Sequence, residues 1–170
     1  MKIIEHTFSV RAGSKLTPRK ATNKIILHCE ATPEGKDFTV QQVDQWHKAQ
    51  KWAMIGYHFV IYRNGEVHRG RPENTIGTHC ADYNSFSIGI SYVGGCDATG
   101  KTPKDTRTDA QKESMYLLVY HLLRKYGLTM DNIFCHNQLT KPAGAKACPS
   151  FSIQRFKHEY LEYFKTHPIK

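Results

Sequence analysis

The chain has 170 residues, of which 39% are hydrophobic and 23% charged, and Lys and Arg outnumber Asp and Glu by 24 to 15. This length fits one domain that can bury a core without disulfides, and no apolar run reaches the ~20 residues of a membrane-spanning helix. The formal net charge of +9 favours a polyanionic partner, such as nucleic acid, anionic lipid or an acidic cell-wall polymer, without choosing among them.

The five cysteines stand at positions 29, 80, 96, 135 and 148. An odd number at irregular spacings argues against a disulfide framework and for free thiols, one of which could serve a metal or a catalytic step. The first 15 residues carry a glutamate and a histidine where a signal peptide would have its apolar stretch. We therefore expect the chain to be made in the cytoplasm without a signal peptide.

The first 51 residues predict an arm, a strand and a helix. Residues 1–23 are polar and basic without sustained periodicity, which indicates an arm or an edge strand. Residues 24–29 (KIILHC) form the short β-branched run of a buried strand. A capping box (TVQQ) opens a helix at 39–51, and we expect Trp46 on its inward face.

The middle of the chain predicts a hairpin, a strand and a long helix. An Asn-Gly pair between two apolar runs predicts a β-hairpin over 57–69 with a type I′ turn at that pair. Residues 87–93 predict another strand, and the turn-rich loop 94–107 should lie at the surface, where it could form a rim. A second capping box and an i, i+3, i+4, i+7 apolar stripe predict a helix over 108–127.

The C-terminal part adds a short strand at 133–135 and an amphipathic helix over 153–164. Because each amphipathic helix must bury its stripe, the order of elements predicts an α/β fold with a mixed central β-sheet flanked by helices on both faces. We expect the basic arm, 1–23, to precede a single domain that covers residues 24–170.

Two histidines stand at ends of predicted strands, His28 after the first and His136 after the last. Adjacent side chains of a strand point to opposite faces, so if these imidazoles face a cleft, the cysteine beside each faces the core. Cys148 precedes a proline, which favours extended backbone and would place Lys146 on the same side. Two imidazoles and a thiolate suit a catalytic zinc with water as fourth ligand. The spacing matches no local metal motif, so ordinary core and surface roles stay equally open.

Several motifs occur together in the order and spacing of a known family. They are 26–32 (ILHCEAT), 45–48 (QWHK), 56–59 (GYHF), 87–90 (SIGI), 93–95 (VGG), 135–136 (CH) and 146–150 (KACPS). With these motifs the chain resembles the zinc N-acetylmuramoyl-L-alanine amidases, specifically the short phage endolysins that share a fold with animal peptidoglycan-recognition proteins. The resemblance covers most of the chain, from about Lys24 to the C-terminus.

The resemblance implies one catalytic Zn²⁺ ion held by His28, His136 and Cys148. It also implies catalytic roles for Tyr57, which would position the water or relay its proton, and for Lys146, which would stabilise the oxyanion. Zinc lowers the pKa of a bound water from about 15.7 to roughly 7. The bond attacked would be the amide that joins N-acetylmuramic acid to L-alanine in peptidoglycan.

Other residues have a functional and an ordinary interpretation. His79 and Asn84 resemble residues that line the substrate groove of the family, but each could equally be a loop residue without that role. We place Trp46 and Trp52 in the core rather than on a sugar-stacking platform, and we expect His58 to be structural.

Two other classes of function stay open. A recognition module would bind peptidoglycan without cutting it, although the presence of the cysteine ligand argues against that class. Some short phage members also bind an RNA polymerase, so an amidase with a second, regulatory role is an alternative. The short, single-domain, signal-free form predicts a phage origin, and such enzymes normally reach the wall after a separate protein has permeabilised the membrane. We also expect a monomer without stable membrane insertion.

Overall fold

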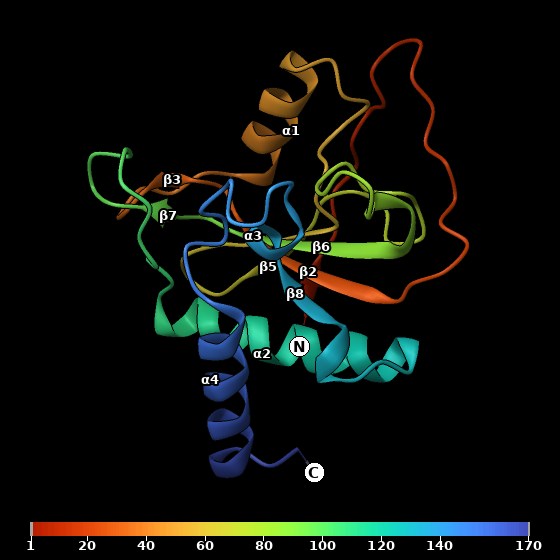
Figure 1. Ribbon diagram of the computed structural model, residues 1–170. Coiled ribbons are helices and arrows are strands. Elements are labelled where there is room, and N and C mark those ends of the chain that lie inside the picture. The colour runs from red at the N-terminus through yellow and green to blue at the C-terminus, as the bar shows by residue number, and fades with distance from the viewer. Residues whose placement is uncertain (1, 170) are drawn as a thin grey trace.

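A six-stranded mixed sheet forms the centre of the computed structural model, which describes residues 2–169 (Figure 1). Its strands, in the order in which they pair, are β1 (Ile3–Ile4), β5 (Val67–Arg69), β4 (Phe59–Ile61), β6 (Ser87–Tyr92), β2 (Lys24–Cys29) and β8 (Ile133–Cys135). Only the hairpin pair β4 and β5 is antiparallel. A separate small sheet pairs β3 (Thr32–Pro33) with β7 (Gly95–Cys96).

Helices cover both faces of the central sheet, as the sequence predicts (Figure 1). On one side lies α1 (Val40–Ala49), and on the other lie α2 (Asp109–Tyr126) and α4 (Ile153–Thr166). The one-turn helix α3 (His136–Leu139) directly follows β8, and two 3₁₀ turns span Asn84–Phe86 and Met130–Asn132. Across residues 2–169, none of the helices has the length and apolar character needed to cross a membrane.

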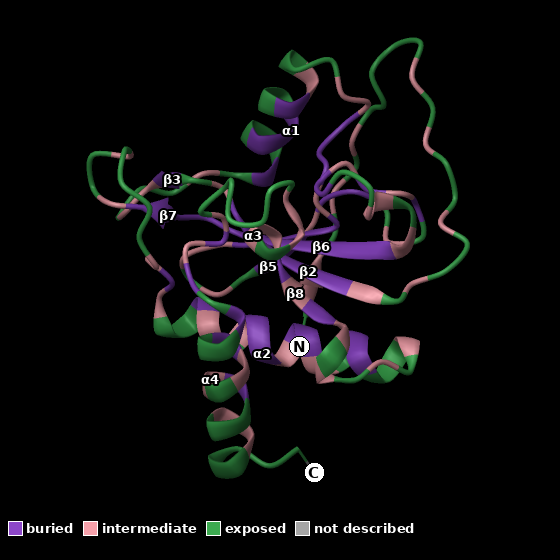
Figure 2. Cartoon of the chain, viewed as in Figure 1, coloured by how far each residue is buried: buried purple, intermediate pink, exposed green. Residues whose placement is uncertain are grey.

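The core is centred on the two longest strands, β2 and β6, which are buried almost end to end (Figure 2). Ile25 and Leu27 project from β2 toward the α2 and α4 side, where they pack with Leu118 and Phe156. Each such side chain contributes roughly 1.5–3 kcal/mol when fully buried. Parallel strands covered on both faces read as continuous apolar runs, which is why KIILHC predicts a strand correctly.

The predicted helix starts are confirmed in detail. Thr39 and Thr108 each form a complete capping box with the glutamine three residues later. The second glutamine, Gln111, also donates its amide N–H groups to the carbonyls of Ile61 (3.1 Å) and Val93 (2.9 Å), which ties α2 to the sheet. Gly127 ends α2 in the left-handed conformation, at φ 62°.

The hairpin forms where predicted, but its turn differs. Gly65 has φ 89°, whereas Asn64 has no positive φ, so the pair does not make a type I′ turn. The Gly65 N–H instead donates to Tyr62 O and the Tyr62 N–H donates to Glu66 O. This three-residue loop with glycine in its last position is the second common hairpin connection, and it uses the same Asn-Gly sequence.

Two other expectations need correction. Trp46 is 39% exposed and packs edge-on against Phe38 at the surface of α1, so it is not a core residue. The loop 94–107 is not wholly a surface loop, because it begins with β7, in which both residues are buried.

The N-terminal residues contribute the edge strand β1, which pairs in parallel with β5. After β1 the chain packs Phe8 and Leu16 against the apolar cluster under α1. Arg19 then donates from Nη1 to Thr75 O at 2.9 Å. These contacts attach the basic segment to the domain at several points, although most of its residues are exposed.

Candidate metal and catalytic site

The structure brings together the three predicted metal ligands. His28 lies in β2, His136 is the first residue of α3, and Cys148 lies in the loop before α4. One nitrogen of each imidazole and the Cys148 sulfur all lie within 4.8 Å of one another, and no other such group of His, Cys, Asp and Glu occurs within residues 2–169.

Strand pairing explains how two of these residues meet. β2 and β8 are parallel neighbours with Leu27 opposite Cys135, so the residues that follow, His28 and His136, share one edge of the sheet. Their ring centroids lie 4.5 Å apart. Cys29 and Cys135 are buried in the core cluster under α2 and α4, which confirms the predicted alternation.

The loop that carries Cys148 is fixed by several hydrogen bonds. The Cys29 backbone N–H donates to Cys148 Sγ at 3.3 Å. Tyr92 Oη donates to Pro149 O at 2.8 Å, and Ser150 Oγ donates to Gly95 O at 2.7 Å. The sulfur is therefore held 3.7 Å from His28 Nδ1 by contacts with β2, β6 and β7.

The electrostatics of the trio suit a cation. Burial, aided by neighbouring His79, lowers the pKa of His28 well below its ordinary value, and burial lowers that of His136 to about 4. Both imidazoles are therefore neutral at pH 7, as metal binding requires. A hydrogen bond with Cys29 and burial raise the pKa of Cys148. A divalent cation would favour the thiolate there, and an N₂S donor set matches the three protein ligands of catalytic zinc sites.

Tyr57 and Glu30 lie beside the trio. The Tyr57 ring centroid is 5.1 Å from that of His28, and burial, then the nearby Glu30, raises the pKa of Tyr57 well above its usual value. Burial also raises the pKa of Glu30 to about 8, and its Oε1 is buried without a hydrogen-bond partner among residues 2–169. Tyr57 thus keeps its proton at neutral pH and can donate it in a hydrogen bond.

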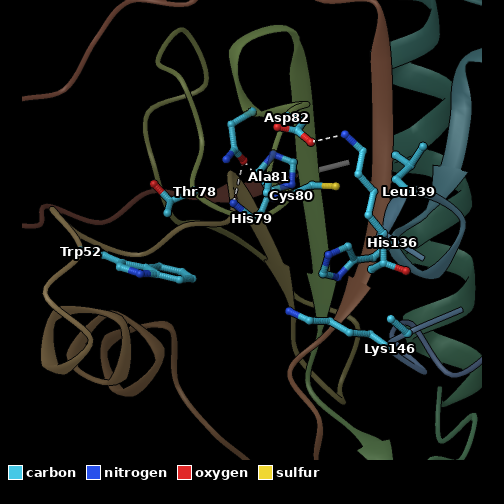
Figure 3. Close-up of a pocket in the computed structure, with 13 residues that line it drawn as sticks. Trp52, Thr78, His79, Cys80, Ala81, Asp82, His136, Leu139 and Lys146 are labelled. Atoms are coloured by element: carbon cyan, nitrogen blue, oxygen red, sulfur yellow. Dashed lines mark hydrogen bonds and ion pairs between the residues drawn. The ribbon is translucent and has the colours of Figure 1, made fainter. Parts of the chain in front are cut away.

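A pocket of about 450 Å³ opens beside the trio, with His136 and Lys146 in its wall (Figure 3). Lys146 is exposed, and its charge contributes to the lowered pKa of His28 and His136. Trp52 stands across the pocket from these residues (Figure 3). The pocket therefore offers a cationic group and an aromatic surface close to the predicted metal ligands.

His79 and Asn84 also line the pocket, but their polar atoms are largely engaged. His79 is 7% exposed and its Nδ1 lies 3.0 Å from His28 Nε2. Asn84 Oδ1 accepts the backbone N–H groups of His79 (2.8 Å) and Cys80 (2.9 Å), so it shapes the loop. His58 is fully buried and bridges Gly89 N–H to Thr75 O, in agreement with a structural role.

Sequence reasoning missed several residues of this region. Trp52 is half-buried in the pocket wall rather than in the core. Asp82 and Lys141 form a 2.7 Å ion pair at the pocket rim, across 59 positions of sequence (Figure 3). Glu30 stands in the recognised motif ILHCEAT, and only its place directly beyond a buried strand could have drawn attention to it.

Comparison with known proteins gives concordant matches. A family model described as N-acetylmuramoyl-L-alanine amidase matches residues 18–151. The endolysin of Klebsiella phage KP32 is 39% identical over 145 residues, which cover 85% of this chain and 91% of that protein.

Two solved structures extend the comparison to the fold. The N-acetylmuramoyl-L-alanine amidase LysC from Clostridium intestinale URNW superposes with a TM-score of 0.76 at 28% identity, covering 94% of this chain and 97% of that one. The bumblebee peptidoglycan-recognition protein PGRP-SA gives 0.72 at 22% identity, covering 92% and 93%, which shows a shared fold.

Proposed function

Because this chain belongs to the N-acetylmuramoyl-L-alanine amidase family, we propose that it hydrolyses the amide bond between N-acetylmuramic acid and L-alanine in peptidoglycan. The observation that carries the proposal is the cluster of His28, His136 and Cys148 in and beside the wall of a pocket. The match to a phage endolysin over most of both chains supports a role in host lysis, at the cell wall, after the membrane has been permeabilised.

His28, His136 and Cys148 would hold one Zn²⁺ ion, with the two imidazoles as neutral nitrogen donors and the cysteine as a thiolate. When bound there, the ion would supply a Lewis acid that lowers the pKa of water and polarises a carbonyl oxygen. The protein would contribute a donor set that is already brought together, because β2, the start of α3 directly after β8 and the anchored cysteine loop each position one ligand.

Two side chains would act on the reacting groups. Tyr57 keeps its proton at neutral pH, so its hydroxyl would position the attacking water as a hydrogen-bond partner. Lys146 projects from the pocket wall beside His136, where its ammonium group would stabilise the oxyanion that forms as the amide carbonyl is attacked. The pocket, with Trp52 opposite, would hold the muramyl peptide, and His79 and Asn84 would shape its wall.

Mass spectrometry of digested peptidoglycan tests the proposed bond. We expect new free L-alanine amino termini, and we expect a metal chelator to abolish them and added zinc to restore them. Products cut within the glycan, or cleavage that resists the chelator, would contradict the proposal.

Lys146→Ala tests the assigned role of that residue. Losing one preorganised oxyanion donor costs roughly 10²–10³ in rate, so the variant should lose nearly all activity. Because Lys146 is exposed, the variant should keep its fold and its bound zinc. Lys141→Ala, at the rim of the same pocket, is the matched control, and we expect it to retain far more activity. A Lys146→Ala protein that cleaves at the wild-type rate would refute the role.

A further inference from the structure

The two ring nitrogens of His28 face different partners. His28 Nδ1 lies 3.7 Å from Cys148 Sγ, on the side of the metal cluster. His28 Nε2 lies on the other side, 3.0 Å from His79 Nδ1. The rings of His28 and His79 meet edge-on, at an interplanar angle of 88°. One nitrogen is therefore directed to the cluster and the other to His79.

The hydrogen bonds beyond His28 form a chain with a single consistent direction. If His28 Nδ1 binds a metal, its proton is on Nε2 and is donated to His79 Nδ1. The proton of His79 is then on Nε2, which lies 3.4 Å from Ser87 Oγ. The Ser87 hydroxyl in turn donates to Tyr83 O at 2.7 Å. Each link joins one donor to one acceptor, and the chain ends on a backbone carbonyl.

The surrounding packing leaves the His79 ring little freedom. A Cβ atom added at Gly77 would lie 2.4 Å from His79 Cδ2, and one added at Gly89 would lie 2.6 Å from His79 Cγ. The ring thus lies between two positions that only glycine leaves open. Asn84 Oδ1 holds the backbone N–H of His79 at 2.8 Å. Glycine within the central strand β6 therefore has a reason in packing, since any side chain there would displace the ring.

We propose that His79 is a positioning residue for the metal site, which fixes the tautomer and ring orientation of His28 through the chain to Ser87. This inference rests on the zinc site proposed above. Partners of this kind, which bind the far nitrogen of a histidine ligand, typically contribute 10–100-fold to metal affinity. The family resemblance predicts His79 in the substrate groove, and His79 does line the pocket, while its Nδ1 faces His28.

Two substitutions at His79 separate the hydrogen bond from the volume of the ring. In His79→Asn the amide oxygen stands where Nδ1 stands in histidine, so it can still accept from His28. In His79→Leu the volume is similar but no acceptor remains. We expect zinc affinity, measured by competition with a chromophoric chelator at fixed pH, to fall 10–100-fold in His79→Leu. It should fall by no more than about threefold in His79→Asn, which keeps the acceptor.

Ser87→Ala gives a second, milder test that keeps the ring in place. It removes the acceptor for His79 Nε2, and we expect a few-fold loss of zinc affinity with little change in the unfolding midpoint of the metal-free protein. Ser87→Ala therefore keeps the inference testable if His79→Leu does not fold.

The wild-type protein distinguishes this inference from the proposed function. If wild type binds one zinc and His79→Leu binds it equally tightly, the positioning role is wrong while the metal site stands. Equal losses in His79→Leu and His79→Asn would also overturn it. If the wild-type protein binds no zinc, the metal site fails and this inference fails with it.

Discussion

Replacing Gly89 by alanine should displace the His79 ring. The new Cβ would lie 2.6 Å from His79 Cγ and 2.7 Å from Nδ1, whereas carbon atoms in contact are about 3.5–4.0 Å apart. One of the two groups must therefore move by roughly 1 Å. Gly89 lies opposite Ile26 of β2, its N–H donates to His58 and its carbonyl accepts from His58 N–H, so the backbone is held on both sides. We expect the ring to move instead.

The displacement has two measurable consequences. Moving the ring by about 1 Å lengthens or bends its 3.0 Å hydrogen bond to His28, and a shift along the bond takes the distance to roughly 4 Å, beyond the range of a hydrogen bond. Overpacking of a core by one methyl group typically costs 1–3 kcal/mol, so Gly89→Ala should lower the free energy of unfolding by about that amount. Zinc affinity should fall by an amount similar to that expected for His79→Leu.

A double-mutant cycle on the metal-free protein isolates the clash. In a His79→Ala background the ring is absent, so adding Gly89→Ala should leave the free energy of unfolding nearly unchanged or even raise it. The reason is that alanine loses less conformational entropy than glycine when a strand folds. Urea unfolding of the four proteins gives the coupling energy, which we expect to be about 1–3 kcal/mol. An equal cost of Gly89→Ala in both backgrounds would refute the packing argument.

Two further changes test the support around the site. Arg107→Met removes a fully buried guanidinium from Asp105 and Glu159, which then rely on the half-exposed Arg155, and should lower the free energy of unfolding by up to about 3–5 kcal/mol in urea. Lys104→Ala, which breaks an exposed pair, should leave the midpoint unchanged. Burial lowers the pKa of His47 to about 4, from about 6.5 unfolded. Between these values the unfolded chain binds a proton that the folded chain does not. The free energy of unfolding should therefore decrease by up to about 3 kcal/mol as the pH is lowered through this range. His47→Asn keeps an acceptor for Gly56 N–H and should reduce that fall in pH-dependent unfolding; an unchanged slope would contradict the assignment.

Elements with strong local signals were predictable from the sequence. Continuous burial of β2 on both faces produced its apolar run, and two capping boxes fixed the starts of α1 and α2. Strands of two residues, such as β1, β3 and β7, are too short to show any periodicity. Trp46 was wrongly placed in the core because it lies next to the buried His47 in α1. The sequence does not show how far the buried face of the helix extends around it, and Trp46 falls outside that face.

The candidate site was predictable only in part, because its geometry depends on strand order. His28 and His136 meet because β2 and β8 pair in parallel, and 108 positions of sequence separate them. Spacing alone could not select them, and the resemblance to a family did. The contact of His79 with His28 joins a loop to a strand 51 positions away, so no local pattern could reveal it. Trp52 follows the end of a helix, and the local sequence there is the same whether its aromatic side chain packs in the core or lines a pocket.

The glycine of the SIGI motif shows how a motif can encode a site that lies elsewhere in the sequence. Glycine in a strand interior lowers the stability of the fold by roughly 0.5–1 kcal/mol relative to alanine. Gly89 nevertheless lies in β6, next to β2 at the centre of the sheet. Nothing in the pairing of β6 requires it, because β2 alongside carries Ile26 at the matching position. The space it leaves is filled by His79, and His79 contacts His28. The identity of residue 89 therefore depends on a ring at residue 79, and a protein of this fold without that ring should accept a larger residue in β6.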